Sequence, residues 1–285
     1  MSDGAKGDGA PAEAVEETVL RRTENGVLWL TLNRPDSGNS VTPAQRNLLI
    51  GLFADASVDL AVRAVVLTAA GEKMFCPGAD LRAPRPAPMA QPEGAPDIPV
   101  GATARTIRTG AQALVSAILD CEKPVIAAVN GTAAGLGAHL AFASDLVIAA
   151  EESKFIEVFV RRGLIPDAGG AYLLPRLVGI QKAKELMFFG DDIPASRAAE
   201  LGLVNKVVPR TELEATTREW AERLARGPTR ALALTKWLVN RSLDVDRRTA
   251  FDEEAWGVEV NMGSEDSREG VAAFVERRET EFKGW

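Results

Sequence analysis

Two glycine-containing segments carry the residues best suited to chemistry at the main chain. They are Phe75–Asp80, with the sequence FCPGAD, and Asn130–Gly137, with the sequence NGTAAGLG. Glycine lets the main chain pass close to a ligand, and the start of a helix offers unpaired N–H donors and the positive end of the helix dipole. Such turns suit an anion or an oxyanion that develops during a reaction. We therefore expect both segments to present backbone donors to a reacting oxygen.

Asp167, in the stretch GLIPDAGG, is the first candidate for moving a proton. Facing an apolar pocket lined by Phe159, its carboxyl group should have a raised pKa, which suits a group that shuttles a proton between carbons. The alternative is a helix N-cap before residues 168–177, a common use of aspartate. The two roles are compatible with each other.

His139 is the only histidine in the chain and is harder to assign. On a helix after the second glycine segment, its imidazole could act as a base, position a water molecule, or be a core residue bonded to a carbonyl group. Glu157 is the other nearby acid, but it shares a strand face with Phe155 and Phe159 and could face either the core or the pocket, so it is left without a role. Cys76 has no second histidine to pair with, so we expect an inert thiol.

Other chemistries are disfavoured by what the sequence lacks. Residues 135–137 (GLG) match half of a dinucleotide-binding fingerprint, but Leu140 stands where the third glycine belongs. A tight turn with close helix packing is a plainer alternative. A single histidine excludes a His-cluster metal site, and the chain contains no GxSxG, HExxH or GxxxxGKS/T segment. Hydrolase, zinc-protease and P-loop functions, and a bound metal, are therefore not expected.

The composition is that of a globular protein of 285 residues, with 46% apolar and 26% charged side chains, enough to bury one large core. Forty acidic against 33 basic residues give a net charge of −7, which repels nucleic-acid phosphates. Cys76 and Cys121 have no CxxC spacing, so we expect no disulfides, no structural zinc and a reducing compartment. Residues 1–11 lack an apolar signal-peptide core, and there is no run of about eighteen apolar residues. We therefore expect a cytoplasmic protein that neither enters a membrane nor binds nucleic acid.

The elements that must position these residues alternate between strand and helix. Asn25-Gly26 between two apolar runs is the strongest short signal for a β-hairpin. Buried strands and helices then alternate, which implies an α/β fold with a largely parallel sheet. The expected elements are strands at 18–22, 27–32, 63–68, 124–129, 145–150 and 203–208 and helices at 42–53, 103–119 and 135–143, with four or five helical segments from residue 171 onward.

Three regions follow from this pattern: a disordered tail over residues 1–16, an α/β core over 17–208, and a helical C-terminal region over 209–285. Within the core, residues 82–101 contain six prolines, too many for a helix or a sheet, and are predicted to form a mobile loop. The loop directly follows the first glycine segment, so we expect it to close over the pocket.

The motifs and their order resemble the crotonase superfamily, the enoyl-CoA hydratase/isomerase family. Its hallmarks are an Asn-Arg-Pro triplet, F-x-x-G-A-D and N-G-x-A-x-G-x-G, and the resemblance runs from about Val19 to the end of the chain. The resemblance implies a crotonase-like core of ββα units arranged in a spiral, with a C-terminal helical region for trimerisation. The matching segments are Asn33-Arg34-Pro35, Phe75–Asp80, Asn130–Gly137, Pro166–Gly170, Leu201–Val204 and Glu269–Phe274.

By this resemblance, the backbone N–H groups of Ala79 and Leu136 donate to the carbonyl oxygen of a coenzyme A thioester. Loss of a proton beside a thioester moves negative charge onto that oxygen, and one preorganised donor is typically worth about 3 kcal/mol. Leu136 stands where the family often has a smaller residue, and it narrows the pocket without removing the donor.

Both catalytic glutamates of the family's hydratases are absent, because their positions hold His139 and Phe159 here, and a phenyl ring cannot exchange a proton. The position of Asp167 resembles that of the aspartate in family isomerases that act on dienoyl or ring-epoxide thioesters. The resemblance therefore implies an isomerase-like enzyme with a proton relay through Asp167. The alternatives are an enoyl-CoA hydratase that uses His139 and Asp167, and a non-catalytic acyl-CoA-binding protein, against which the retained oxyanion segments and the negative charge argue.

Coenzyme A carries phosphates, so an acidic protein needs local cations to hold it. By resemblance, Arg34 and Arg82 lie near the coenzyme A end of the cleft, while Phe274 and Arg277 belong to a C-terminal helix that reaches the ligand of a neighbouring subunit. For each arginine, a solvated surface charge is the alternative. The family implies a homotrimer or a dimer of trimers, and no cofactor apart from the coenzyme A of the substrate. The other expected binding residues are Pro77, Gly78, Gly135 and Phe159.

Overall fold

The computed structural model describes residues 15–83 and 92–285. Most of the predicted tail, residues 1–14, and the middle of the proline-rich segment, residues 84–91, lie outside the described residues. Val15 and Glu16 belong to a short 3-10 helix, η1 (Val15–Thr18). The described residues of 82–101 form turns, without helix or strand.

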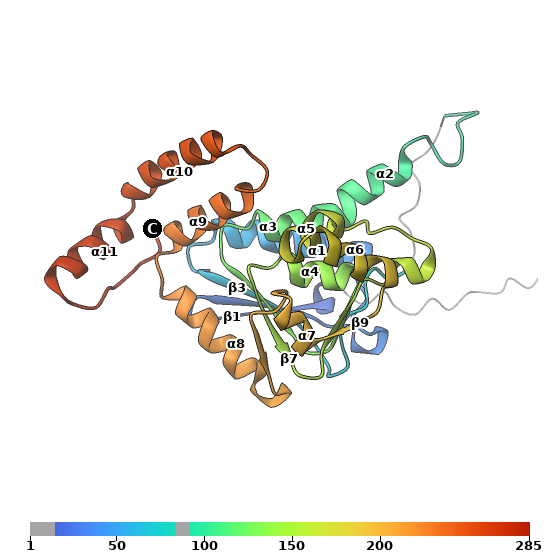
Figure 1. Cartoon of the computed structure of the whole chain (residues 1–285), viewed down its shortest axis with the longest axis horizontal. Helices are drawn as coiled ribbons and strands as arrows, with labels where there is room; N and C mark the ends of the chain where they lie inside the picture. The colour runs from blue at the N-terminus through green and yellow to red at the C-terminus, as the bar shows by residue number, and fades with distance from the viewer. Residues whose placement is uncertain (1–14, 84–91) are drawn as a thin grey trace, which may run out of the picture.

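A six-stranded sheet forms the centre of the molecule (Figure 1). The predicted hairpin is confirmed: its first two strands pair antiparallel, and Asn25 and Gly26 both have positive φ, 51° and 76°, as a tight two-residue turn requires. All other pairs in this sheet are parallel, which confirms the predicted alternation. In spatial order the strands are β1 (Val19–Glu24), β2 (Val27–Leu32), β3 (Ala64–Ala69), β5 (Val125–Val129), β7 (Leu146–Ala150) and β10 (Lys206–Val208).

A second, four-stranded sheet was not predicted, because its strands have only three residues each and carry no periodic signal. Its strands are β4 (Met74–Cys76), β6 (Thr132–Ala134), β8 (Lys154–Ile156) and β9 (Asp192–Pro194). The first three directly follow β3, β5 and β7 along the chain, so one strand of each sheet and the helical segment after them form a repeated ββα unit. The first glycine segment lies in this small sheet and the loop after it, and the second runs through β6 into the start of α4.

Helices cover both faces of the large sheet (Figure 1). On one face, α1 (Pro43–Val58), α3 (Ala113–Leu119) and α4 (Leu136–Ala143) pack on a core that includes Phe53, Leu67 and Leu140. On the other face, α8 (Arg210–Ala225) packs on Trp29, Ile148 and neighbouring side chains. The near-continuous apolar runs of β3 and β5 follow from this burial on both faces.

The predicted helix over 103–119 is wrong as a single element. It divides into α2 (Ala102–Ile107), a π-helical turn (Arg108–Gln112) and α3. Gly110 has φ −106° and ψ −106°, and a Cβ there would lie 2.6 Å from Nη1 of Arg46 on α1, so the chain bends where this side chain passes.

The remaining helices belong to the C-terminal half. In Figure 1, α10 and α11 project away from the body of the molecule. Lys236 on α9 ties this region to the core, since its ammonium group lies 2.8 Å from Asp145 and also donates to the carbonyl groups of Ile118 and Lys123. The bounds are α5 (Gly170–Val178), α6 (Ile180–Phe189), α7 (Ala195–Glu200), α9 (Thr229–Arg241), α10 (Arg247–Met262) and α11 (Glu265–Glu276).

Candidate active site

Strand pairing brings the two predicted backbone donors together. β4 and β6 lie side by side in parallel, with Cys76 opposite Ala133. The turn after β4 therefore lies beside the start of α4, and a Cβ on Gly78 would be 3.8 Å from the amide nitrogen of Leu136. Ala79, the next residue, is exposed at this junction.

The hydrogen bonds of the same turn direct the Ala79 amide away from the sheet. Val41 donates to the carbonyl of Gly78 and accepts from the amide of Asp80, so the residue between them points its own N–H to the opposite side. Leu136 is the first residue of α4 and has no earlier helical carbonyl to bond. Within the part of the chain that the structure describes, neither the Ala79 nor the Leu136 amide donates a hydrogen bond.

Gly137 explains how α4 can begin so close to β4. A Cβ at this position would lie 2.0 Å from the carbonyl oxygen of Cys76, a separation that no real side chain tolerates. Only glycine lets the first turn of the helix pack directly on the strand that leads to Ala79. The glycine of the sequence motif is thus required by backbone packing.

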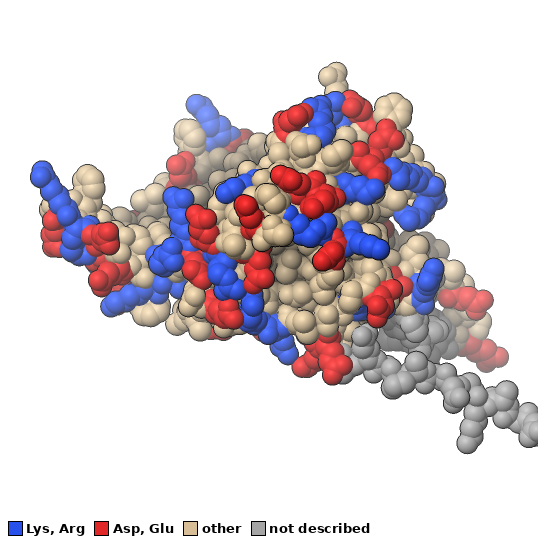
Figure 2. Space-filling model, turned by 90° about the horizontal axis from the view of Figure 1, so that it is seen from below, with Lys and Arg blue, Asp and Glu red and all other residues tan. Residues whose placement is uncertain are grey.

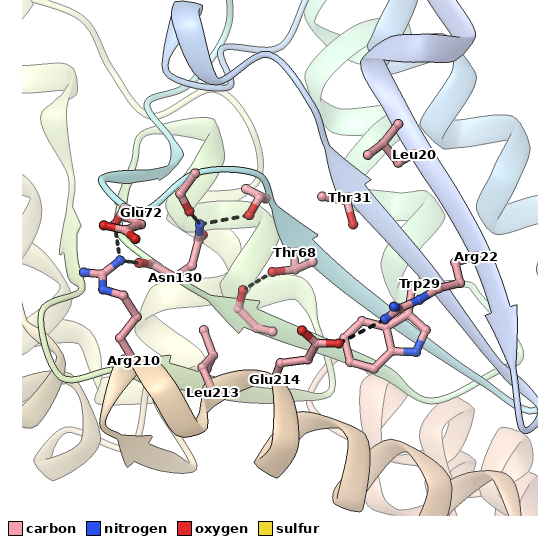
Figure 3. Close-up of a pocket in the computed structure, with 13 residues that line it drawn as sticks. Leu20, Arg22, Trp29, Thr31, Thr68, Glu72, Asn130, Arg210, Leu213 and Glu214 are labelled. Carbon is pink, nitrogen blue, oxygen red and sulfur yellow. Dashed lines mark hydrogen bonds and ion pairs between the residues drawn. The ribbon is translucent and has the colours of Figure 1, made fainter.

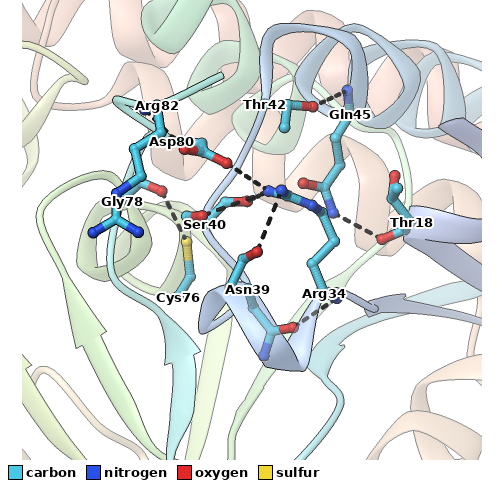
Figure 4. A network of polar contacts seen from close by, with 11 residues as sticks. Thr18, Arg34, Asn39, Ser40, Thr42, Gln45, Cys76, Gly78, Asp80 and Arg82 are labelled. Carbon is cyan, nitrogen blue, oxygen red and sulfur yellow. Dashed lines mark hydrogen bonds and ion pairs between the residues drawn. The ribbon is translucent and has the colours of Figure 1, made fainter. Parts of the chain in front are cut away.

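Arg34 and Asn39 fix the loop that supports the first donor (Figure 4). The guanidinium of Arg34 donates to Asp80 at 2.9 Å and to the carbonyl of Ser40 at 2.7 Å. The Asn39 side chain is buried, accepts from the Arg34 amide and donates to the carbonyls of Ala70 and Met74. Arg34 of the Asn-Arg-Pro motif and Asn39, five residues later, therefore hold the segment around Ala79 in place.

The charge of Asp80 is stabilised by this arrangement. Burial would raise the pKa of Asp80, but the Arg34 guanidinium and the amide of Arg82 outweigh it and lower the pKa. Arg34 is 16% exposed in its side chain, so it is an engaged and largely buried cation, unlike the solvated surface charge considered as its alternative.

One cavity of about 870 Å³ collects most of the predicted site. Its walls come from the loops after β2 and β4, the starts of α1 and α4, the end of α2 with the π-helical turn, and the segment between β8 and α5. Apolar side chains of Leu136, Val158 and Phe159 form one wall. The predicted residues that line it are Arg34, Pro77, Gly78, Ala79, Arg82, Gly135, Leu136, Phe159 and Asp167.

Asp36, Asp80 and Asp167 all line this cavity. Asp36 is exposed and Asp80 is paired with Arg34, whereas Asp167 is half-buried. It does not cap a helix: α5 begins at Gly170, its N-cap is Gly169, and no side chain bonds the free amides of its first turn. Burial raises the pKa of Asp167, and the charge of His139 partly opposes that rise. The predicted elevation of its pKa is therefore present, and the capping alternative is wrong.

His139 lies behind the cavity wall, paired with Glu157. Both side chains are buried, and Nε2 of His139 is 3.2 Å from each carboxylate oxygen of Glu157. The ring of Phe159 stacks on the imidazole, with centroids 5.3 Å apart and planes 19° from parallel, and separates it from the cavity. In the sequence, Glu157 shares a strand face with Phe155 and Phe159. That pattern does not decide whether its side chain faces the core or the pocket, so its pairing with His139 was not predicted.

The remaining predicted residues lie elsewhere. Phe274 and Arg277 are exposed on and just after α11, outside the lining of this cavity, so their predicted role toward a neighbouring subunit stays a prediction. Cys76 is buried and its pKa is raised by desolvation to about 12, which agrees with an inert thiol. In residues 15–83 and 92–285, no group of three or more His, Cys, Asp or Glu side chains is arranged to hold a metal ion.

A second cavity, of about 540 Å³, lies between α8 and the large sheet (Figure 3). Several of its polar side chains are engaged within the fold, while Nε1 of Trp29 and Oδ1 of Asn130 have no hydrogen-bond partner among the described residues. Thr68 donates to the carbonyl of Ala128, Arg210 donates to the carbonyls of Asn130 and Glu72, and the Arg22 guanidinium stacks over the indole of Trp29. The predicted proton-moving residues and backbone donors lie outside it.

Solved structures place this architecture among the crotonases. The chain superposes on the crystal structure of an enoyl-CoA hydratase from Bacillus anthracis with a TM-score of 0.83 and 33% identity, covering 94% of this chain and 100% of that chain. The repeated ββα unit and the C-terminal helices are therefore those of the crotonase fold, as predicted.

The sequence agrees, and the chain belongs to the enoyl-CoA hydratase/isomerase family, whose model matches residues 22–285. It is 37% identical over 268 residues to the 1,2-epoxyphenylacetyl-CoA isomerase of Escherichia coli, covering 94% of this chain and 99% of the relative. It is 35% identical over 265 residues to the short-chain-enoyl-CoA hydratase of Clostridium acetobutylicum, covering 92% and 96%. The family and the enzyme class are thus confirmed.

Two further observations bear on partners. Figure 2 shows Lys and Arg side chains interspersed with Asp and Glu over the face that it presents, without one extended basic patch. Of the helices in the described residues, none has both the length and the apolar character needed to cross a membrane.

Proposed function

We propose that this enzyme isomerises an unsaturated coenzyme A thioester, with Asp167 relaying a proton along the acyl chain. The observation that carries the proposal is the position of Asp167. It is a half-buried carboxylate with a raised pKa in the cavity that also presents the Ala79 and Leu136 amides. A carboxylate with a raised pKa is a better match for taking and returning a proton near neutral pH.

The reaction has two steps, removal of a proton and its return to a different carbon. The Asp167 carboxylate removes a proton from a carbon beside the thioester or its conjugated double bond, and the electron pair of the broken C–H bond moves onto the thioester oxygen. The Ala79 and Leu136 amides donate to that enolate oxygen and stabilise it. Asp167 then returns the proton to a different carbon, which shifts the double bond and restores the carboxylate.

The geometry disfavours the alternative of water addition through His139. The imidazole is fully buried behind Phe159 and already bonded to Glu157, so it does not meet a substrate in the cavity. Phe159 itself supplies an apolar wall and no proton. Of the aspartates that line the cavity, Asp167 is the half-buried one without an arginine partner among the described residues, which suits a relay within one molecule better than a two-group addition of water.

Arginines at the cavity support binding of coenzyme A phosphates in an otherwise acidic protein. Arg82 and Arg162 are exposed at the cavity, while burial lowers the pKa of Arg46 without removing its charge at neutral pH. We include in the proposal a homotrimer or a dimer of trimers, no metal, and no cofactor apart from the coenzyme A of the substrate. Its support is the family resemblance and the exposed apolar side chains of α10 and α11.

The test is turnover in D₂O of a panel of 2-enoyl, 3-enoyl and dienoyl coenzyme A thioesters, followed by chromatography and mass spectrometry. We expect a shifted double bond, with deuterium incorporation and no added water. Asp167→Asn should lower kcat on the best substrate by roughly 10²- to 10⁴-fold, the usual contribution of a general acid–base, while binding of coenzyme A is retained. Asp55→Asn, on the exposed face of α1, is the matched control and should keep full activity.

Each other outcome has a definite meaning. Net addition of water to a 2-enoyl thioester would replace the isomerase with a hydratase. Undiminished turnover by Asp167→Asn would remove Asp167 from the mechanism. No change of any thioester by a protein that still binds coenzyme A would favour the non-catalytic alternative.

A further inference from the structure

The His139–Glu157 pair is buried as a unit behind the cavity wall. Both carboxylate oxygens of Glu157 lie 3.2 Å from Nε2 of His139, and Nδ1 of the same ring has no hydrogen-bond partner among the described residues. An ionised carboxylate that is only 1% exposed needs an opposite charge, because burying it alone is strongly unfavourable. A protonated imidazole beside a carboxylate makes the buried pair neutral as a whole.

The pair touches the turn that carries Asp167. A Cβ on Gly170 would lie 2.2 Å from Nε2 of His139 and 2.4 Å from Cε1, so the ring packs directly on the main chain three residues after Asp167. Gly169, between them, has φ +81° and packs on Val115 of α3. The imidazole therefore forms the support on which this turn lies.

The charge of His139 reaches Asp167, where it opposes the effect of burial. The titratable groups that face His139 from the surrounding elements are Glu157, on the segment after β8, and Asp167, on the turn before α5. Cys76, on β4 below the start of α4, remains a neutral thiol near neutral pH. The residues that α3 buries against α4 are apolar and include Leu114 and Val115.

We propose that His139 and Glu157 are positioning residues that hold the Asp167 turn against the cavity and keep the Asp167 carboxylate ionised for proton removal. This inference rests on the proposed isomerase function. Glu157 supplies the counter-charge that lets His139 stay protonated inside the protein, and His139 in turn stabilises the negative charge of Asp167. Phe159 separates the pair from substrate, so neither residue is a catalytic group in its own right.

The acidic limb of the pH profile of kcat/KM tests this role, because that limb follows the ionisation of the base in the free enzyme. His139→Gln removes the positive charge, so the pKa of Asp167 should rise and the limb should move to higher pH. We expect a shift of about one pH unit, the low end of the effect of one nearby opposite charge on a carboxylate. The loss of kcat/KM relative to wild type should be severalfold larger at about pH 5.5 than at about pH 8.

Glu157→Gln keeps the shape of the side chain and serves as the second variant if His139→Gln does not fold. It removes the counter-charge, so His139 should lose its extra proton and the limb should move in the same direction. The double variant should not shift the limb further than either single variant, because the two side chains act as one unit.

The single histidine allows a direct reading of charge, in protein free of a histidine tag and labelled with ¹⁵N in the imidazole ring. At the pH of maximal activity we expect both ring nitrogens to carry protons in the wild type, and only one in Glu157→Gln. Lys236→Gln, which breaks the ion pair with Asp145 outside the cavity, controls for lost stability and should leave the limb where it is.

The inference is overturned if His139→Gln and Glu157→Gln lower the melting temperature but leave the limb in place, since that is a purely structural role. A neutral imidazole in the wild-type spectrum would also overturn it. If Asp167→Asn keeps full turnover, the proposed function itself fails. If Asp167→Asn is inactive while the limb of His139→Gln is unmoved, only the role of the pair fails.

Discussion

At the scale of single residues, the site combines two backbone N–H donors, which do not depend on side-chain type, with the side-chain carboxyl group of Asp167, which does. The Ala79 and Leu136 donors belong to the main chain, so their positions depend on backbone packing at Gly137 and on the Arg34–Asp80 contact. Asp167 depends on its surroundings, because burial raises its pKa and His139 opposes that rise. Substitutions that change packing and substitutions that change charge should therefore have separable effects.

The raised pKa of Asp167 predicts a cost in stability at neutral pH. A carboxyl group whose pKa is higher in the folded than in the unfolded state binds its proton more tightly when folded. The folded state therefore loses stability as pH rises from about 4, the ordinary aspartate value, through the raised pKa. Asp167→Asn removes this loss, so its free energy of unfolding relative to wild type should increase over that window. Urea unfolding at several pH values measures the difference, and a constant difference would contradict the expectation.

Gly137→Ala tests the packing of α4 on β4. The new Cβ would lie 2.0 Å from the Cys76 carbonyl, so the helix start must move. We expect a loss of about 2 kcal/mol or more in unfolding free energy, as for other overpacked sites, together with a lower kcat because the Leu136 donor moves. Gly51→Ala is the matched control: it lies in α1 with nothing within 4 Å, and alanine should stabilise the helix by about 0.5 to 1 kcal/mol. Full activity of Gly137→Ala would show that the donor position tolerates this shift.

At the scale of elements, the strands of the large sheet and α4 could be predicted because long apolar runs and glycine turns are local signals. The four short strands could not, because each is held by pairing with a distant segment. The bend at Gly110 depends on Arg46, which is more than sixty residues away in the chain. The pairing of Glu157 with His139 could not be predicted for the same reason. Strand alternation places Glu157 on the same face as the neighbouring aromatic side chains, but it does not decide whether Glu157 lies in the core or in the cavity.

The attachment of α9 to the core gives a prediction at this scale. Lys236 is 7% exposed in its side chain and pairs with Asp145, whose pKa burial raises and Lys236 lowers. Lys236→Met leaves the Asp145 carboxylate, which is 23% exposed in its side chain, without its cation, and we expect a loss of roughly 1 to 3 kcal/mol in unfolding free energy, between an exposed and a fully buried pair. Lys182→Met, which removes an exposed pair with Glu185, should cost less than about 1 kcal/mol. Equal losses in the two variants would show that the Lys236–Asp145 pair does not secure the helix.

At the scale of the whole molecule, helices α10 and α11 extend beyond the core of the single chain. Helices α10 and α11 project from the body (Figure 1) and expose large apolar side chains, among them Phe251, Trp256 and Phe274. We therefore predict that this apolar surface contacts another molecule. A symmetric assembly of identical chains would cover it and would bring Phe274 and Arg277 near a neighbouring cavity, as the family resemblance implies.

The mass in solution, measured by light scattering after size exclusion, should therefore be three or six times the 30.4 kDa of one chain. Trp256→Glu, at a side chain that is 69% exposed, places a charge in the predicted contact and should give mainly single chains. Leu60→Glu, 64% exposed after α1, is the matched control and should keep the assembly. Because Phe274 and Arg277 are predicted to hold a neighbour's ligand, Trp256→Glu should also weaken coenzyme A binding in calorimetry while its fold, followed by circular dichroism, is preserved. A wild-type mass of one chain would contradict the trimer, and a dissociated variant with unchanged coenzyme A affinity would confine the ligand to the residues of a single chain.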